Sequence, residues 1–291
     1  MDTFKTKPGI PEEILITEEN FANETGRQFP YAMKKNEKIT YKAVCPACDN
    51  LIQIIGLFKR EEEVKRKPYG RHTTIDLPGL TVYSEEDYLN CPYHNPNPHN
   101  SDAKRKPGNK KSQYFYNLMK EHFDLIVLIL EKKLQIYVSY HFAETLLRSW
   151  RDNEGWRYYD TNYNNLPYML LFAEMARPMF GKLIQKDSNV EKAILEKGIN
   201  FQLEDVGMDY YRKIKQRDGF LDATFYLTHH HFERKGEHTE ETYLYRVVEG
   251  KNKIYEEKIV VEKGRLYEIT QKQGKRSARE ERLIEIANKI L

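Results

Sequence analysis

Two short segments of the chain carry residue types that bind metal ions. Cys45-Pro46-Ala47-Cys48 and Cys91-Pro92-Tyr93-His94 each place two thiol or imidazole ligands three positions apart, with proline in the second position. In such tight turns backbone N–H groups can point at a bound sulfur and stabilise its negative charge. All three cysteines of the chain lie in these segments. We therefore predict a four-ligand metal site made of Cys45, Cys48, Cys91 and His94, with His99 as the replacement for His94.

This set of ligands resembles that of Cys3His zinc ribbons and related zinc knuckles. The resemblance implies a bound Zn²⁺ with a structural role, because four protein ligands leave no open position for a substrate. The 42 residues between Cys48 and Cys91 exceed the spacing of a minimal ribbon, so we expect the second segment on an inserted loop or hairpin.

His72 lies between the two segments and suggests an alternative function. His-Asn-His endonucleases also contain zinc knuckles, with a catalytic histidine between them, so a metal-dependent nuclease is the alternative hypothesis. That family places a further His or Asn on the helix that leads into the second knuckle, whereas residues 84–90 offer Asn90 alone. A looser acid-acid-lysine set made of Asp222, Glu256 and Lys258 would also suit a nuclease.

A histidine tract falls within a predicted strand near the C-terminus. Alternation along the strand places His229 and His231 on one face and His230 on the other. Together with His238, the two histidines of one face leave open a second metal site. Histidines of an ordinary, partly solvated strand are the simpler interpretation.

Basic residues are concentrated around the cysteines. Residues 33–112 contain 15 Lys and Arg against 10 Asp and Glu, a local charge of +5. Because such side chains bind phosphates and tyrosines stack on bases, we expect this region to contact nucleic acid. The candidate contact residues are Lys65, Arg66, Lys67, Tyr69, Arg71, Lys104, Arg105 and Lys106. No segment near the cysteines has the pattern of a recognition helix, so we expect binding that does not depend on the nucleotide sequence.

Aromatic residues are concentrated between Trp150 and Tyr168. An exposed cluster of this kind would suit protein recognition, since Trp and Tyr dominate binding hot spots. A core between helices, with tyrosine hydroxyls at its edge, explains the same pattern. A pure protein-interaction module is therefore a third functional hypothesis.

The pattern of elements predicts an α+β fold. A zinc-knuckle or zinc-ribbon-like N-terminal module leads to a helical middle and a C-terminal antiparallel sheet closed by a helix. Ser188 and Ser277 are predicted to begin helices with a capping box, and Arg265–Ile269 is predicted as a strand. The predicted parts are an N-terminal arm (1–37), a zinc-binding module (38–100), a basic linker (101–112), a helical region (113–218) and the sheet with its C-terminal helix (219–291).

Composition narrows the class of protein. The 291 residues are 40% hydrophobic and 31% charged, with a formal net charge of +3, so a disordered polyelectrolyte is excluded. The longest aliphatic run, Leu125–Leu130, is too short to span a membrane, and the first residues do not resemble a signal peptide. We expect a cytoplasmic, non-enzymatic zinc protein that contacts nucleic acid or a nucleoprotein complex, with a further protein partner as an alternative and no membrane partner. The abundance of Lys, Glu, Ile, Asn and Tyr suggests an AT-rich genome, bacterial or phage. A phage or mobile-element factor that acts on a host defence complex would fit this composition and the expected architecture.

Overall fold

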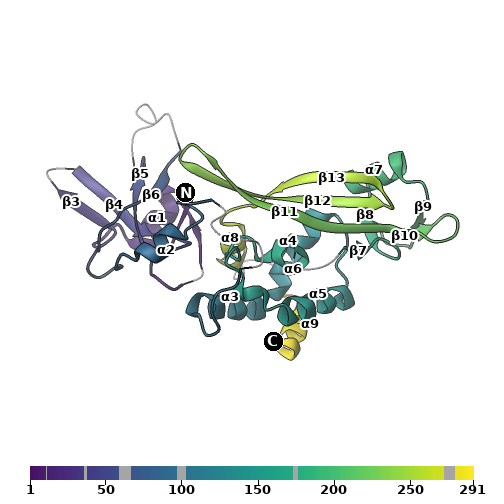
Figure 1. Cartoon of the computed structure of the whole chain (residues 1–291), viewed down its shortest axis with the longest axis horizontal. Coiled ribbons are helices and arrows are strands. Elements are labelled where there is room, and N and C mark those ends of the chain that lie inside the picture. Colours follow the sequence, from purple (N-terminus) through teal and green to yellow (C-terminus); the bar gives the residue numbers. More distant parts are fainter. Residues whose placement is uncertain (11, 36–37, 59–66, 97–102, 173–175, 272–278) are drawn as a thin grey trace.

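The computed structural model combines helices and antiparallel sheets along an elongated body (Figure 1). It is 33% helix and 30% strand, as the α+β prediction requires. The structure describes residues 1–10, 12–35, 38–58, 67–96, 103–172, 176–271 and 279–291. One end of the body holds the cysteines, the middle holds the helices, and a long hairpin runs across both (Figure 1).

A four-stranded antiparallel sheet organises the N-terminal end, with strand order β3-β4-β5-β6. Its strands are β3 (Ala32–Lys35), β4 (Lys38–Val44), β5 (Leu51–Ile55) and β6 (Tyr69–His72). Helix α2 (Glu85–Leu89) follows, and the Ser84 side chain caps it by accepting from the N–H of Asp87 at 3.3 Å. The buried face of the sheet forms a small apolar core around the cysteines.

The described residues of the predicted arm (1–37), which are 1–10 and 12–35, are folded into this module. Strands β1 (Thr3–Phe4) and β2 (Ile14–Leu15) pair with each other, and helix α1 (Glu18–Thr25) follows them. Phe4 and Phe21 are buried in the same cluster as the cysteines. The apolar residues of this segment therefore complete a core that the cysteine-containing strands cannot close alone.

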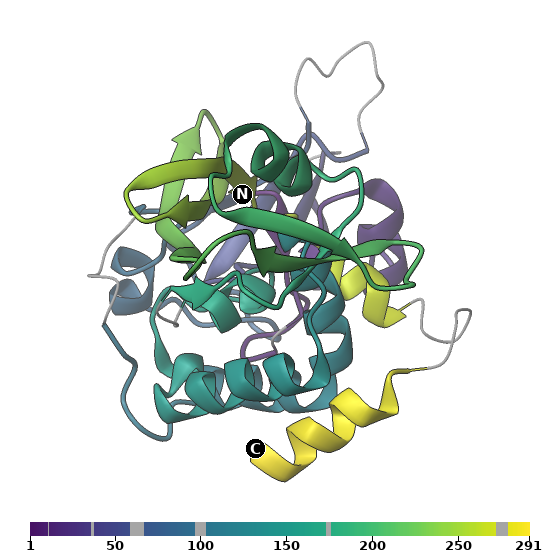
Figure 2. The same cartoon turned by 90° about the vertical axis from the view of Figure 1, so that its right-hand side faces the viewer.

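Helices and a long sheet form the larger part of the protein. The helices are α3 (Lys110–Glu121), α4 (Phe123–Leu134), α5 (Tyr140–Asp152), the 3-10 turn η2 (Gly155–Arg157) and α6 (Leu166–Phe172). They cover one face of the sheet β13-β12-β11-β7, made of β7 (Arg177–Pro178), β11 (Ala223–Lys235), β12 (His238–Glu249) and β13 (Asn252–Val260) (Figures 1 and 2). One apolar cluster joins the two layers, and Phe142 of α5 meets Phe225 of β11 with ring centroids 6.0 Å apart.

The region predicted as helical, 113–218, is helical in its first part and mixed after Phe172. Strands β8 (Leu183–Gln185), β9 (Phe201–Asp205) and β10 (Tyr211–Gln216) form a small sheet at the far end, beside helix α7 (Asn189–Lys197). The predicted cap of α7 is confirmed, because Ser188 accepts from the N–H of Glu191 at 3.1 Å. The strands here are short, with little of the alternation that would distinguish them in sequence.

The C-terminal segment contains two further differences. Residues 265–269, predicted as a strand, lie in helix α8 (Arg265–Gln271), which buries Leu266 against the main core. Helix α9 (Glu281–Ile290) packs against α3, α4 and α5 on the helical side of the body (Figure 1). The helical layer therefore separates α9 from the sheet that it was expected to close. Ser277, the predicted cap, lies outside the described residues.

Candidate metal centre

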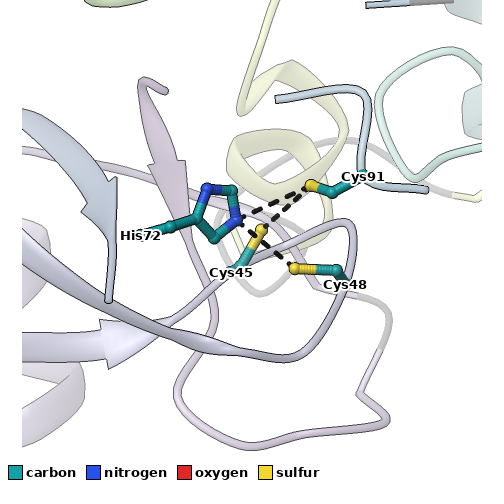
Figure 3. A group of neighbouring side chains, drawn as sticks. All are labelled: Cys45, Cys48, His72 and Cys91. Carbon is teal, nitrogen blue, oxygen red and sulfur yellow. Dashed lines mark hydrogen bonds between the residues drawn. The ribbon is translucent and has the colours of Figure 1, made fainter. Parts of the chain in front are cut away.

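Four side chains that can bind a metal meet at one point of the N-terminal module. They are Cys45, Cys48, His72 and Cys91, and their ligand atoms all lie within 4.8 Å of one another. Cys45 directly follows β4, Cys48 precedes β5, His72 ends β6, and Cys91 follows α2. Figure 3 shows the three thiols facing one nitrogen of the His72 ring. The group can hold a metal ion.

The separations within the group are short. The Nε2 atom of His72 lies 3.3 Å from the sulfur of Cys48 and 3.6 Å from that of Cys91. The sulfurs of Cys45 and Cys91 are 3.8 Å apart. All three cysteines are buried, and His72 is half-buried, so the thiols are screened from solvent.

The turn between β4 and β5 sets the positions of the first two thiols. The N–H of Cys45 donates to the carbonyl of Asn50 at 2.8 Å, and Asp49 adopts a left-handed backbone conformation with φ 61°. This reversal brings Cys48 back beside Cys45, as the sequence spacing predicts. Backbone N–H groups of Ala47 and Cys48 donate to the sulfur of Cys45.

Burial and hydrogen bonding act in opposite directions on the thiols. Burial raises the pKa of Cys91 well above its ordinary value, and the neighbouring thiols add to this effect. At Cys45 the same burial is outweighed by hydrogen bonds from the Cys48 and Cys91 thiols and from the two backbone N–H groups, so its pKa falls well below the ordinary value. A bound cation would favour ionisation of the thiols.

Asn50 supports the group from outside. Its buried side chain donates to the sulfur of Cys48 at 3.5 Å and to the carbonyl of Ser84 at 2.9 Å, and it accepts from the N–H of Ser84 at 2.7 Å. Because Ser84 caps the helix that leads to Cys91, one carboxamide connects the two cysteine-containing segments. Sequence spacing does not reveal this contact.

The fourth position of the group differs from the sequence prediction. His94 was expected there, but its ring stacks on Tyr88 with centroids 3.9 Å apart, and the group contains His72 in its place. His99 lies outside the described residues. His72 belongs to a strand whose edge reaches the thiols, whereas His94 follows Cys91 on a turn that directs its ring to the helix. The available signal was that His72 is the one histidine between the two segments.

The predicted nucleic-acid contacts have different environments. Lys65 and Arg66 lie outside the described residues, while Lys67, Arg71 and Lys106 are exposed. Tyr69 is half-buried with its ring 6.1 Å from that of His238.

Two of these residues make contacts within the protein. Arg105 is 7% exposed and donates to the carbonyls of Tyr158, Tyr159 and Thr161 at 2.6, 2.6 and 3.3 Å. Burial lowers the pKa of Arg105 to about 10, so it still carries its charge at neutral pH. Lys104 pairs with Glu154 at 3.7 Å and lies over the Tyr158 ring. Lys104 and Arg105 therefore attach the predicted basic linker to the helical part of the protein.

The weaker candidate sites do not come together as metal sites in the described residues. His229 and His231 are exposed, whereas the side chain of His230 is buried, stacks on the Tyr243 ring and pairs with Glu241. Glu256 pairs with Arg246 and Lys253, and Lys258 pairs with Glu233 and Glu240. These strand residues have the ordinary roles of a solvated sheet and its core.

The aromatic stretch belongs to the core of the body. Trp150, Tyr163 and Tyr168 are at most 1% exposed, and the ring of Trp156 packs 5.2 Å from that of Trp150. The burial of these rings matches the interpretation of the stretch as a core between helices. Little of the stretch is therefore exposed for a partner to bind.

Comparisons with known proteins add no identification. No protein-family model, no curated protein and no solved structure matches this chain. Among the described residues, no helix has the length and apolar character needed to cross a membrane.

Proposed function

We propose that the protein is a non-enzymatic zinc protein that binds nucleic acid through the sheet attached to the metal centre. Zinc fits the donor set, since thiolates and imidazole in a buried four-ligand group are typical of structural zinc. A tetrahedron with ordinary zinc bond lengths separates two sulfurs by about 3.8 Å, and a sulfur from a nitrogen by about 3.6 Å. The separations of 3.8, 3.6 and 3.3 Å are close to these values.

One feature of the sheet carries the nucleic-acid part of this proposal. Lys42 on β4 lies opposite Gln53 on β5, and Gln53 lies opposite Arg71 on β6. Residues that are directly opposite share a face, so the three side chains form a ladder across the sheet. Lys42 donates to the Gln53 side chain at 3.3 Å, and no carboxylate of the described residues pairs with Lys42 or Arg71.

The charge of this ladder is not compensated locally. Partial burial lowers the pKa of Lys42, and the nearby positive charge of Arg71 lowers it further. Two neighbouring cations without a counter-charge attract phosphates. Tyr69, two residues before Arg71 on the same face of β6, offers a ring on which a base can stack.

The alternatives receive less support. A nuclease would need His72 as a base, but its Nε2 atom faces the thiols. A module that recognises proteins through residues 150–168 would need exposed rings, yet Trp150, Tyr163 and Tyr168 are buried. Incubation with DNA or RNA and divalent cations tests the nuclease directly, and we expect no cleavage.

Binding measured as a function of salt tests the proposal. We expect Lys42→Gln with Arg71→Gln to weaken binding of a fluorescent single-stranded oligonucleotide, and to reduce the slope of log affinity against log salt by about 1.4, since each phosphate contact contributes about 0.7. The matched control, Lys197→Gln with Lys251→Gln, removes two exposed charges far from the sheet and should bind as the wild type does. Equal affinities of the two double variants would contradict the proposal.

A further inference from the structure

A cleft of about 410 Å³ opens beside the metal centre. Strand β6 contributes Arg71 and His72, the segment around Cys91 contributes Tyr88 and His94, and the tip of the β11–β12 hairpin contributes Arg234 and Glu237. Figure 1 shows the hairpin tip next to the N-terminal sheet. The volume is within the range of small-ligand sites.

His72, one of the metal-binding group, also lines this cleft. Its Nε2 atom faces the thiols, and Figure 3 shows the other ring nitrogen, Nδ1, on the side away from the sulfurs. A histidine that binds a metal almost always donates its second N–H to an acceptor, which fixes the ring and strengthens the ligand. In the part of the chain that the structure describes, no atom accepts a hydrogen bond from Nδ1 of His72.

The charge that lines the cleft indicates the kind of acceptor. Arg71 and Arg234 are both exposed and both line the cleft, and Glu237 is the one carboxylate among the lining residues. Arginine binds phosphate oxygens through two parallel N–H donors. The Arg234 guanidinium and the imidazole N–H, with the charge of Arg71 nearby, therefore match a group with several anionic oxygens better than a neutral acceptor.

We propose that this cleft binds a phosphate group, with one phosphate oxygen accepting from Nδ1–H of His72 and with Arg234 neutralising its charge, while Arg71 lies at the edge of the cleft. Arg71 belongs to the Lys42–Gln53–Arg71 ladder and also lines the cleft. A nucleic-acid strand bound across this face of the sheet would therefore reach the cleft. The identification of a nucleic-acid strand as the source of this phosphate rests on the proposed function, whereas the phosphate site itself does not.

Pyrophosphate and a cobalt-substituted protein test the site without nucleic acid. Bound Co²⁺ replaces zinc, and its visible absorption reports changes around its histidine ligand. We expect pyrophosphate to change this spectrum saturably, Arg234→Gln to weaken its binding at least 10-fold, and Glu237→Gln to strengthen it. Lys251→Gln, at the opposite end of the hairpin, is the control and should bind pyrophosphate as the wild type does. An unchanged spectrum, or equal affinity of Arg234→Gln and wild type, would overturn the site.

A second variant separates the imidazole from the two arginines. His72→Cys keeps four metal ligands but removes Nδ1–H, so we expect it to retain one metal ion per chain and to bind pyrophosphate at least 10-fold more weakly by calorimetry. Wild-type affinity in this metal-loaded variant would contradict the role of His72.

Competition identifies the source of the phosphate. We expect a 5′-phosphorylated single strand to displace pyrophosphate more strongly than the same strand with a 5′-hydroxyl. If neither strand binds while pyrophosphate does, the nucleic-acid source fails together with the proposed function, and the cleft stands as a site for a free phosphate anion. If strands bind through Lys42 but pyrophosphate leaves the cobalt spectrum unchanged, the cleft proposal fails alone.

Discussion

The N-terminal module and the C-terminal body are stabilised in different ways. The module has a small apolar cluster, with the three cysteines among its buried members, and a sheet of short strands. The body buries one continuous cluster that extends through its helices and both central strands of the long hairpin. A small core seldom sustains a fold without a metal or disulfides, whereas a large one does. Metal dependence should therefore be local to the module.

A polar junction connects the two regions. The buried carboxylate of Glu13 accepts from the side chains of Asn164 at 2.7 Å and Thr3 at 3.3 Å. The ammonium group of Lys111, on α3, donates to the carbonyl of Ala47 in the cysteine turn. Because of these contacts, we expect a structural change in the module to affect the part of the body that they touch.

Removal of a thiol ligand should produce the largest difference between the regions. We expect Cys48→Ser to abolish stoichiometric metal binding and to remove hydrogen-exchange protection from β4 and β5, because structural zinc supplies much of the folding free energy of such modules. The strands β12 and β13 should keep their protection. An equal loss of protection along the whole chain would show instead that module and body unfold as one unit.

Truncation of Arg105 should destabilise the body by a smaller amount. We expect Arg105→Ala to lower the free energy of unfolding by about 2–3 kcal/mol, since three carbonyls lose a charged donor. Lys106→Ala, which removes an exposed charge one position later, should change it by less than about 0.5 kcal/mol. Denaturant titration followed by tryptophan fluorescence measures both, and similar values would contradict the structural role of Arg105.

Loss of the Asn50 side chain should affect the affinity for metal more than the stability of the body. We expect Asn50→Ala to weaken metal binding by about 10- to 100-fold, as is common for residues that support metal ligands. Asn90→Ala, whose side chain donates to the carbonyl of Glu86 on the surface, is the control. Competition with a chromogenic chelator gives both affinities. Equal affinities would show that Asn50 does not support the site.

The junction should show a modest dependence on pH. Burial raises the pKa of Glu13 above its ordinary value of 4.5, with Lys5 and Lys111 opposing the rise. A raised native pKa means that the native state holds the proton more tightly, so this stabilisation is complete below pH 4.5 and is lost as pH rises through the raised pKa. We expect the wild type to lose stability across this interval relative to Glu13→Gln. Parallel stability curves for the two proteins would contradict this assignment.

The sequence predicted those parts of the fold that depend on local patterns. The cysteine turn, the cap at Ser188 and the strands of the long hairpin follow from spacing, capping chemistry and alternation. Residues 265–269 were misassigned because β-branched and aromatic residues there serve a helix packed on the core. Propensity is overridden when tertiary burial favours the other conformation.

The site was predictable only in part for the same reason. Three ligands lie in turns that the sequence reveals, but the fourth depends on which strand passes the thiols, a long-range relation. Arg105 was predicted to contact phosphate because it lies in a basic linker. In the structure it donates instead to the carbonyls of Tyr158 and Tyr159. Charge in a sequence does not show whether the partner is a ligand or the protein itself.

The identity of the fourth metal ligand is the most direct test of this account. Metal content and chelator competition should be measured for His72→Ala and His94→Ala in parallel. We expect His72→Ala to lose more than about 100-fold in metal affinity, and His94→Ala to retain about one zinc ion per chain with near wild-type affinity. Retention of tight binding by His72→Ala together with its loss in His94→Ala would contradict the assignment of His72 as the fourth ligand.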